Sequence, residues 1–236
     1  MPVKRSFLVT ALKIFTLAVL TFATIQLSGL KVKASTTKTA VVDATSLNVR
    51  KGPGTSYKKI GSLKDKTKVT VYLITKNNWA KIKYSQSTAF VSNEFLRYYQ
   101  TMSRSNAKKI VSKPVKLLRT LPDRSTRKKI HLYFGSSFTS SYIDKIIKYD
   151  MEPNGKDKYG NTLYSYIGTD APYYYFFDFD WNADYSPKKP TVTYFVKNNT
   201  EYLYIKQYIT SELAEYTQHL YLYKTKDNWK VYKCTY

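Results

Sequence analysis

The sequence predicts a multidomain protein: a small all-β barrel followed by an α+β domain with one helix packed on a curved antiparallel sheet. Three observations support this fold class. Short alternating apolar segments separated by turns fill residues 40–96, a pattern typical of a closed barrel. One amphipathic segment and six strand-like segments occupy residues 130–236. The chain has 236 residues, enough for more than one core.

The first strand and turn of the predicted barrel carry the strongest local signal. Leu47 and Val49 share one face of an extended chain, because strand side chains alternate with a period of two. Arg50 stands where the strand ends, and the Gly-Pro-Gly sequence at residues 52–54 supplies the backbone angles that a tight turn needs. The same pattern of alternating apolar residues followed by turn residues predicts further short strands at 60–63, 67–72, 77–84, 89–92 and 95–96.

Residues 40–96 resemble a bacterial SH3 domain, the small β-barrel found on many exported cell-wall proteins. The matching residues are Leu47-Asn48-Val49-Arg50, Gly52-Pro53, Tyr57, Gly61, Leu63, Thr67, Val69, Val71, Trp79, Lys81, Ile82, Tyr84 and Phe90-Val91-Ser92. Two positions depart from the family pattern: Lys66 stands where a turn glycine is usual, and Ala89-Phe90 replaces a Gly-Tyr pair.

The resemblance implies that the barrel docks on peptidoglycan, on its peptide stems or cross-bridges. The candidate ligand-binding residues are Asn48, Arg50, Tyr57, Trp79 and Tyr84. For the three aromatic residues, packing in the barrel core is the first interpretation and ligand contact the second. No cofactor is expected.

The N-terminal residues 1–34 predict an export signal peptide. Lys4 and Arg5 give a positive start, and residues 14–27 form a mostly apolar run. As a helix this run spans about 20 Å, less than the roughly 30 Å of a bilayer core. Small residues at 32–34 then favour cleavage before Ser35 and a secreted, cell-wall-associated protein. An uncleaved membrane anchor is the alternative.

The charge and cysteine content agree with an exported protein. The net charge is +23, and residues 1–34 hold five Lys/Arg and no acid, so their removal leaves +18. Such a charge attracts polyanions, and outside a Gram-positive cell these are anionic wall polymers or membrane surfaces rather than nucleic acid. The alternative is that the lysines keep a tyrosine-rich chain soluble. Cys234 is the single cysteine, so no intramolecular disulfide forms.

These patterns predict four segments: a signal peptide at 1–34, the barrel at 38–99, a connector at 100–129 and the α+β domain at 130–236. In the connector we expect Pro114 to break any helix. In the last domain we expect Ser141 and Asp144 to form the capping box of a helix, and Pro153-Asn154-Gly155 to end that helix. Strands are expected at 162–168, 173–181, 191–197, 202–209, 218–225 and 228–234. This arrangement resembles cystatin-like or nuclear-transport-factor-like domains, and with no motif specific to either it assigns no functional residue.

A second possible binding surface is the tyrosine-rich face of the predicted sheet. Leu203, Ile205 and Ile209 fall on one side of a strand, and tyrosines fall on the other. The candidate residues are Tyr202, Tyr204, Tyr208, Tyr221 and Tyr223. Rigid phenol rings suit sugar rings or a protein partner such as a wall enzyme, although cross-strand tyrosine ladders also stabilise sheets on their own.

A metal site is the weakest of the candidate sites. Its candidate ligands are Asp178, Asp180, Asn182 and Asp184, spaced as in a calcium loop. Ala183 replaces the glycine that such a loop needs, and Lys189 replaces its bidentate Glu. We therefore expect solvent-facing carboxylates at a strand end rather than a metal.

The sequence offers few residues that could act in catalysis. Cys234 lies in a strand-like segment without the helix start that would lower the pKa of its thiol, and His131 and His219 lie far apart in the sequence. Carboxylates such as Asp170, Asp178 and Glu212 leave a glycosidase open. The sequence thus predicts a non-enzymatic wall-binding protein whose C-terminal domain is a binding, adaptor or inhibitor module, with a cell-wall hydrolase as the alternative.

Overall fold

The computed structural model describes residues 37–121, 123–168, 174, 176–210 and 215–236. The predicted signal peptide and the candidate acids Asp170 and Glu212 lie outside these ranges. The described part is rich in strands: it has one large antiparallel sheet, a second sheet of three strands and three α-helices. A large antiparallel sheet with a strand-rich N-terminal part agrees with the predicted fold class at this coarse level.

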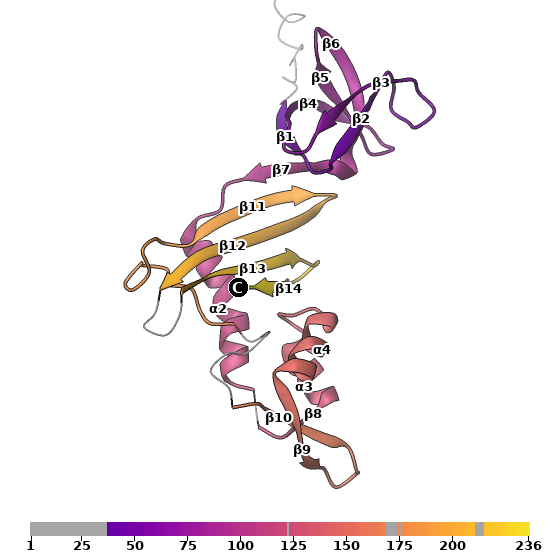
Figure 1. Cartoon of the computed structure of the whole chain (residues 1–236). Helices are drawn as coiled ribbons and strands as arrows, with labels where there is room; N and C mark the ends of the chain where they lie inside the picture. Colours follow the sequence, from indigo (N-terminus) through magenta and orange to yellow (C-terminus); the bar gives the residue numbers. More distant parts are fainter. Residues whose placement is uncertain (1–36, 122, 169–173, 175, 211–214) are drawn as a thin grey trace, which may run out of the picture. The chain divides into compact units, whose positions relative to one another are not determined.

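The N-terminal strands follow the predicted order (Figure 1). They are β1 (Lys38–Val42), β2 (Ser46–Arg50), β3 (Lys59–Lys64), β4 (Lys68–Ile74), β5 (Trp79–Tyr84), β6 (Ser87–Ser92) and β7 (Leu96–Gln100), with the short 3-10 helix η1 (Asn93–Phe95) before β7. Neighbouring strands run β7-β1-β4-β5-β6-β2-β3. Their inward side chains form a buried cluster that includes Leu47 and Val49, as the alternation predicts.

The last barrel strand also continues into the C-terminal half of the chain. β7 pairs with β1 on one side and with β11 (Thr191–Lys197) on the other. Asp43 forms ion pairs with both Arg97 and Lys197. Partial burial raises the pKa of Asp43, and the two cations outweigh burial and lower it.

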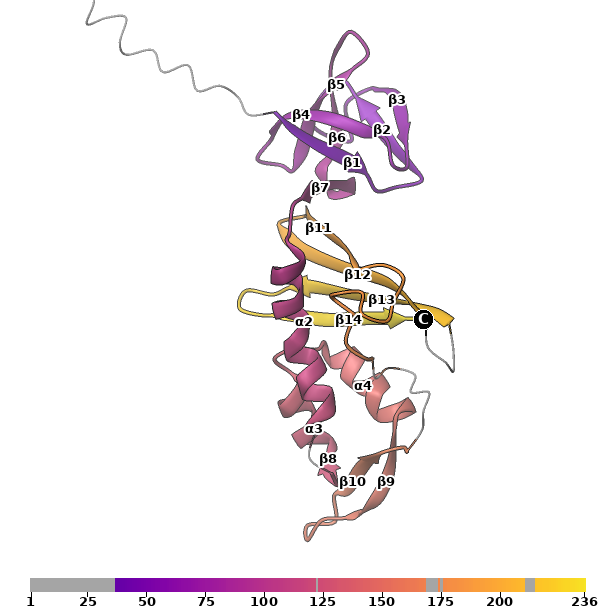
Figure 2. The ribbon, with the colours of Figure 1, turned by 90° about the vertical axis from the view of Figure 1, so that its left-hand side faces the viewer.

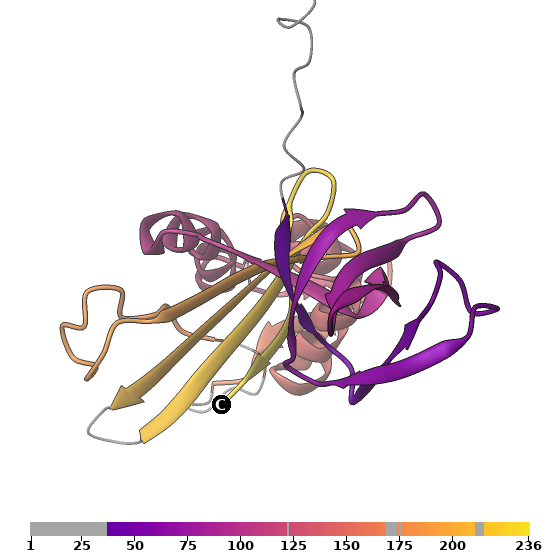
Figure 3. The ribbon, with the colours of Figure 1, turned by 90° about the horizontal axis from the view of Figure 1, so that it is seen from above.

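The C-terminal half contributes four strands of the large sheet, β11 to β14, together with the three-stranded sheet and the three helices. Its elements are α2 (Arg104–Arg119), β8 (Ser125–Thr126), α3 (Arg127–Phe134), α4 (Ser140–Tyr149), β9 (Met151–Lys156), β10 (Thr162–Tyr166), β11, β12 (Thr200–Thr210), β13 (Glu215–Lys224) and β14 (Trp229–Thr235). In Figure 2, α2 crosses the strands β11–β14. Figure 3 shows these strands fanning out, the twist expected of an antiparallel sheet.

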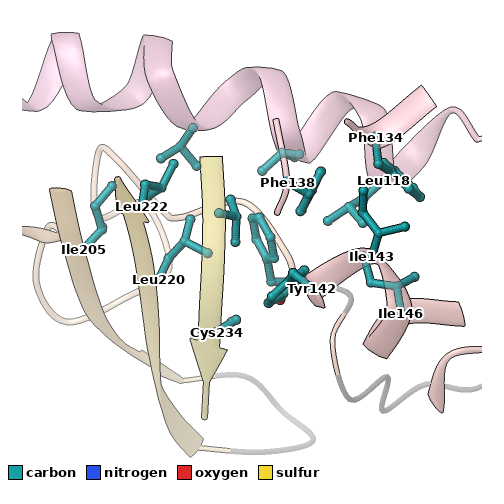
Figure 4. Close-up of a cluster of buried hydrophobic side chains, with 14 of the residues drawn as sticks. Leu118, Phe134, Phe138, Tyr142, Ile143, Ile146, Ile205, Leu220, Leu222 and Cys234 are labelled. Atoms are coloured by element: carbon teal, nitrogen blue, oxygen red, sulfur yellow. The ribbon is translucent and has the colours of Figure 1, made fainter. Parts of the chain in front are cut away.

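One hydrophobic cluster joins these helices to the sheet. It contains Leu118 from α2, Phe138 and Tyr142 around the start of α4, and Leu220 and Leu222 from β13 (Figure 4). Phe138 stacks on Tyr142 with ring centroids 5.7 Å apart. Backbone hydrogen bonds from Thr139 N to Val231 O and from Val231 N to Ser137 O fix the loop before α4 to β14.

The expectation of a single helix is wrong, because α2 and α3 precede α4. α2 occupies most of the segment predicted as a connector, and Pro114 lies inside it instead of breaking it. A proline within a helix costs about 3 kcal/mol. The helix nevertheless buries Val111, Val115 and Leu118 along one face, and this burial outweighs the missing backbone hydrogen bond. The domain limits themselves remain a prediction.

The start and end of the predicted helix also differ from the structure. Thr139 is the N-cap of α4, and its side chain accepts a hydrogen bond from Tyr142 N, so Ser141 is not the cap. Asp144 instead contacts Arg127 and His131 of α3. The helix ends at Tyr149, before the residues 153–155 that were expected to stop it, and those residues lie in β9.

Five of the six predicted C-terminal strands are present, as β10 to β14. The strand expected at 173–181 is absent from its described residues, 174 and 176–181. Within this stretch the N–H groups of Phe179 and Asp180 donate to the side chains of Asp178 and Gln207 instead of to a neighbouring strand. Asp178 accepts from Phe179 N, and Asp180 accepts hydrogen bonds from Asp184 N, Tyr185 N and Ser186 N.

Two buried glutamines attach this irregular segment to the sheet. Gln207 of β12 and Gln218 of β13 lie opposite each other on the core side. The Gln207 amide donates to Asp180 O and Lys188 O at 2.9 and 3.0 Å, and its oxygen accepts from Asp180 N. The Gln218 amide donates to Phe177 O at 3.0 Å. Both buried amides thus bind the main chain of residues 177–188.

Candidate functional site

The barrel carries a surface groove of about 350 Å³ beside strand β2. Its lining residues are Ser46, Leu47, Asn48, Arg50, Thr55, Trp79, Ser92, Glu94 and Phe95. Three of the five predicted ligand residues, Asn48, Arg50 and Trp79, are therefore brought together. The groove walls are the end of β2, the following loop, the start of β5 and the η1 turn.

The loop at residues 51–58 forms one wall and is held in place by hydrogen bonds at its base and its tip. Arg50 Nη1 donates to Tyr57 O at 2.8 Å, and Lys51 N donates to Lys58 O at 3.0 Å. Asn77 Nδ2 reaches across from the β4–β5 turn to Pro53 O at 2.7 Å. Arg50 thus positions the loop as well as lining the groove.

Tyr57 closes this loop from outside and is not part of the barrel core. Its side chain is 49% exposed, so the core interpretation of this residue is wrong. The ring lies against Gly52: a Cβ placed on Gly52 would come within 2.3 Å of it. Any side chain at position 52 would push the ring away, and this explains the glycine.

Trp79 and Tyr84 have different surroundings. Trp79 is half-buried and lines the groove, so the ring is not plain core either. Tyr84 is half-buried, packs against the barrel core and covers Gly61, where a Cβ would lie 2.0 Å from the phenol oxygen. The structure therefore assigns Tyr84 a packing contact away from the groove-lining residues.

Sequence reasoning missed two residues of the opposite wall, Glu94 and Phe95. They lie on η1, which is fixed by Asn93: its Nδ2 donates to Asn78 Oδ1 at 2.8 Å, and its Oδ1 accepts from Tyr98 at 2.6 Å. Phe95 is 40% exposed, an unusual state for a large apolar side chain. The sequence alone does not indicate this exposure, because it depends on how the η1 turn lies against the barrel. A cation, a carboxylate, amide and hydroxyl groups and two aromatic rings thus line one groove.

The structure also brings together the tyrosines of the second candidate surface, with the exception of Tyr208. On β12 and β13, Tyr202 lies opposite Tyr223 and Tyr204 opposite Tyr221. The Tyr204 and Tyr221 rings are 4.8 Å apart. Tyr208 lies further along β12, and its hydroxyl donates to Glu215. Four of the five predicted tyrosines therefore belong to one ring network.

Two of the candidate metal ligands, Asp178 and Asp180, have structural partners, and the expectation of a solvent-facing carboxylate at a strand end is wrong for the buried Asp180. Trp181 Nε1 donates to Asp178, and the three backbone N–H groups described above surround Asp180. Burial raises the pKa of Asp180, but these N–H groups outweigh burial and lower the pKa to about 2. Asp180 is thus unsuited to act as a general acid. Among the described residues, no group of three or more His, Cys, Asp or Glu is placed to hold a metal ion.

The scarce cysteine and histidines lie in separate places. Cys234 is buried, and burial raises the pKa of its thiol to about 12, which keeps it neutral. His219 lies on β13, and burial together with Lys206 and Lys233 lowers its pKa. His131 sits between Asp144 (2.8 Å) and Ser140 (3.4 Å).

The Ser140–His131–Asp144 arrangement has the group order of a hydrolase triad. No sequence motif indicated it, because its members lie on two helices, α3 and α4. The same Asp144 oxygen is held by Arg127, and the Ser140 and Asp144 side chains are exposed. We interpret the cluster as a polar link between the two helices.

Comparison with known families identifies one part of the chain. Residues 45–97 match the bacterial SH3 domain, which confirms the resemblance. No curated protein matches the chain. In the part of the chain that the structure describes, no helix is long and apolar enough to cross a membrane.

Proposed function

Because residues 45–97 match a bacterial SH3 domain, and such domains commonly bind cell-wall components, we propose that this is an exported cell-envelope protein that binds peptidoglycan peptides in the barrel groove. The observation that carries the proposal is the convergence of Asn48, Arg50 and Trp79 on one groove. The predicted signal peptide at 1–34 supports export to the cell wall.

The groove chemistry supports a peptide ligand. Peptide stems and cross-bridges carry amides together with free amino or carboxyl ends. Arg50 offers a cation for a carboxylate, and Glu94 offers a carboxylate for an amine. Asn48 can bond to a peptide amide, and the half-buried Trp79 ring provides an apolar surface.

The positive charge adds a second, weaker attraction. The chain carries +23, or +18 without residues 1–34, and this favours anionic polymers of a Gram-positive wall. Screening shortens from about 10 Å at 0.1 M salt to about 3 Å at 1 M. Charge-driven binding should therefore fade with salt, and short contacts in the groove should persist. The C-terminal half supplies a further contact, as a binding, adaptor or inhibitor module.

Retention on purified cell walls tests the proposal. The compact unit of residues 37–236 should bind intact walls tightly at 0.1 M salt. On walls stripped of anionic polymers at 1 M salt it should bind more weakly but measurably. Trp79→Leu and Glu94→Gln should lower that residual binding by about tenfold, the loss of about 1.4 kcal/mol. These variants are preferred to Arg50→Ala because Arg50 also holds the 51–58 loop.

Matched variants control for general effects. Trp229→Leu removes a half-buried tryptophan from β14, and Glu152→Gln removes an exposed carboxylate from β9; both should retain full binding. If the unmutated unit is not held on stripped walls at high salt, the groove does not bind peptidoglycan and charge alone holds the protein. Release of soluble wall fragments would favour the hydrolase alternative.

A further inference from the structure

The side of strands β11–β14 that faces away from the helices carries a connected set of aromatic rings, here called the tyrosine face. Its members are Phe195, Tyr202, Tyr204, Tyr221, Tyr223 and Tyr232. Leu203, Ile205, Leu220 and Leu222 point to the other side of the same strands and form the helix-covered core. The five tyrosines are half-buried, so part of each ring faces solvent.

The rings of the tyrosine face are fixed before any ligand arrives. Phe195 is buried and stacks on Tyr202 at 5.1 Å with a 12° interplanar angle. Tyr232 donates a hydrogen bond to the Tyr204 hydroxyl at 3.1 Å. Side chains that are already ordered lose little entropy on binding, which favours recognition.

The charge around the rings is positive. Lys233 lies 5.2 Å from the Tyr221 ring centre, and Lys206 of β12 is exposed and lies opposite His219. Arg97 lies 5.0 Å from the Phe195 ring centre but is paired with Asp43, so Lys206 and Lys233 carry the positive charge of this surface. Two nearby acids are already engaged, because Asp43 holds two cations and Glu215 accepts from Tyr208 at the far end of β12.

The outward positions of β12 and β13 hold tyrosine, threonine, lysine, histidine and one glutamate, and no aliphatic side chain. The centre of a docking surface for another protein is depleted of charged residues, lysine above all, whereas Lys206 and His219 lie directly beside the Tyr204–Tyr221 pair. A surface of flat rings with hydroxyl tips and flanking lysines instead complements sugar rings, their hydroxyl groups and negative charges.

We propose that the tyrosine face binds an anionic glycan, with sugar rings stacked on the tyrosines and carboxylates held by Lys206 and Lys233. In a cell wall, glycan strands whose peptides have been removed expose such carboxylates. The inference rests on the proposed wall location, but it concerns the sugar backbone rather than the peptide held in the groove.

Titration calorimetry with a hyaluronan octasaccharide tests this, since that probe carries a carboxylate on every second sugar and has no peptide. Two double variants, Tyr204→Leu with Tyr221→Leu and Lys206→Glu with Lys233→Glu, should each weaken binding at least tenfold. The lysine pair is exposed and should fold normally, which circular dichroism checks. Chitohexaose, which has no carboxylates, should bind at least tenfold more weakly than hyaluronan to the unmutated unit.

The chain offers a matched control at the β9–β10 turn, where Lys158 lies 4.9 Å from the ring centre of the exposed Tyr159. Tyr159→Leu with Lys158→Glu should leave hyaluronan binding unchanged, and so should Glu94→Gln in the groove. If the unmutated unit does not bind hyaluronan but is still held on stripped walls at 1 M salt, this inference alone is overturned and the groove proposal stands.

Two further results would contradict the proposal. One is equal hyaluronan binding by the tyrosine-face variants and the control variant. The other is equally tight binding of oligothymidylate or polyphosphate of the same charge, which would indicate a nucleic acid or a bare polyanion as the ligand.

Discussion

The barrel and the β11–β14 half of the molecule treat their aromatic residues differently. In the barrel, which the structure describes in full, the buried cluster is entirely aliphatic, and Tyr57, Trp79 and Phe95 lie at the surface or rim. In the C-terminal half, Phe134, Phe138 and other rings fill the core. A small closed barrel has room only for small inward side chains, whereas an open sheet covered by helices leaves a wider space for rings.

This contrast explains why the core interpretation of Tyr57 and Trp79 is wrong. A strand pattern indicates which side a residue faces, and it says little about how much space lies on that side. The small barrel therefore exposes its rings around a groove, and the open sheet spreads them over a whole face.

The largest expected effect is a loss of stability, and it tests directly whether aromatic rings contribute more to the C-terminal core than to the barrel. Phe138→Ala should cost about 3–5 kcal/mol in the free energy of unfolding, because it leaves a cavity among buried rings. Trp79→Ala should cost only about 1–2 kcal/mol, because its ring is half-buried. Urea unfolding followed by circular dichroism measures both. Equal costs would show that Trp79 is barrel core after all.

An intermediate effect concerns the loop that replaces the expected strand. Asp180→Asn should lower stability by about 2 kcal/mol at pH 7, because a charged acceptor of three N–H groups is lost. The pKa of Asp180 falls from 3.8 to about 2 on folding. The unfolded state thus binds the proton more tightly, so this stabilisation is fully present above about pH 4 and is lost as pH falls towards 2.

Stability curves of the parent and of Asp180→Asn between pH 7 and pH 2 measure the difference. The two curves should converge at the acid end. A gap that stays constant over the whole range would mean that the carboxylate charge plays no part. Asp178→Asn is the matched control, since Asp178 accepts from one backbone N–H and from the Trp181 ring instead of three backbone groups.

The smallest expected effect is the change in stability when one turn residue in each half is replaced by glycine. Lys66 in the barrel and Ala183 in the C-terminal loop both adopt a left-handed conformation, each with φ of 63°. Glycine takes this conformation without strain. Lys66→Gly and Ala183→Gly should therefore each stabilise the protein by about 0.5–1 kcal/mol, read from the thermal midpoint. Destabilisation by either change would show that the replaced side chain makes contacts worth more than the strain.

Lys66 shows what the sequence could and could not predict. The family pattern identified it as the place of a turn glycine, and the backbone there has glycine-like geometry. Alternation likewise predicted the buried faces of β2 and β12. These features depend on residues close together in the chain.

The features that were missed depend on distant partners. Glu94 and Phe95 reach the groove because Asn93 bonds to Asn78, fifteen positions away. α2 tolerates Pro114 because a sheet some 100 residues downstream covers its apolar face. A local sequence pattern does not reveal partners that are distant in the chain. The groove wall and the helices α2 and α3 could therefore not be predicted.

The buried pair Gln207 and Gln218 has a consequence for how the C-terminal hairpin folds. A strand that slides by two residues keeps its core side and still buries apolar groups, so hydrophobicity alone distinguishes such slips poorly. Here a slip would move both amides away from the carbonyl groups of residues 177–188 and leave buried donors without partners. The two glutamines therefore select one alignment of β12 against β13, and that alignment brings Tyr204 opposite Tyr221.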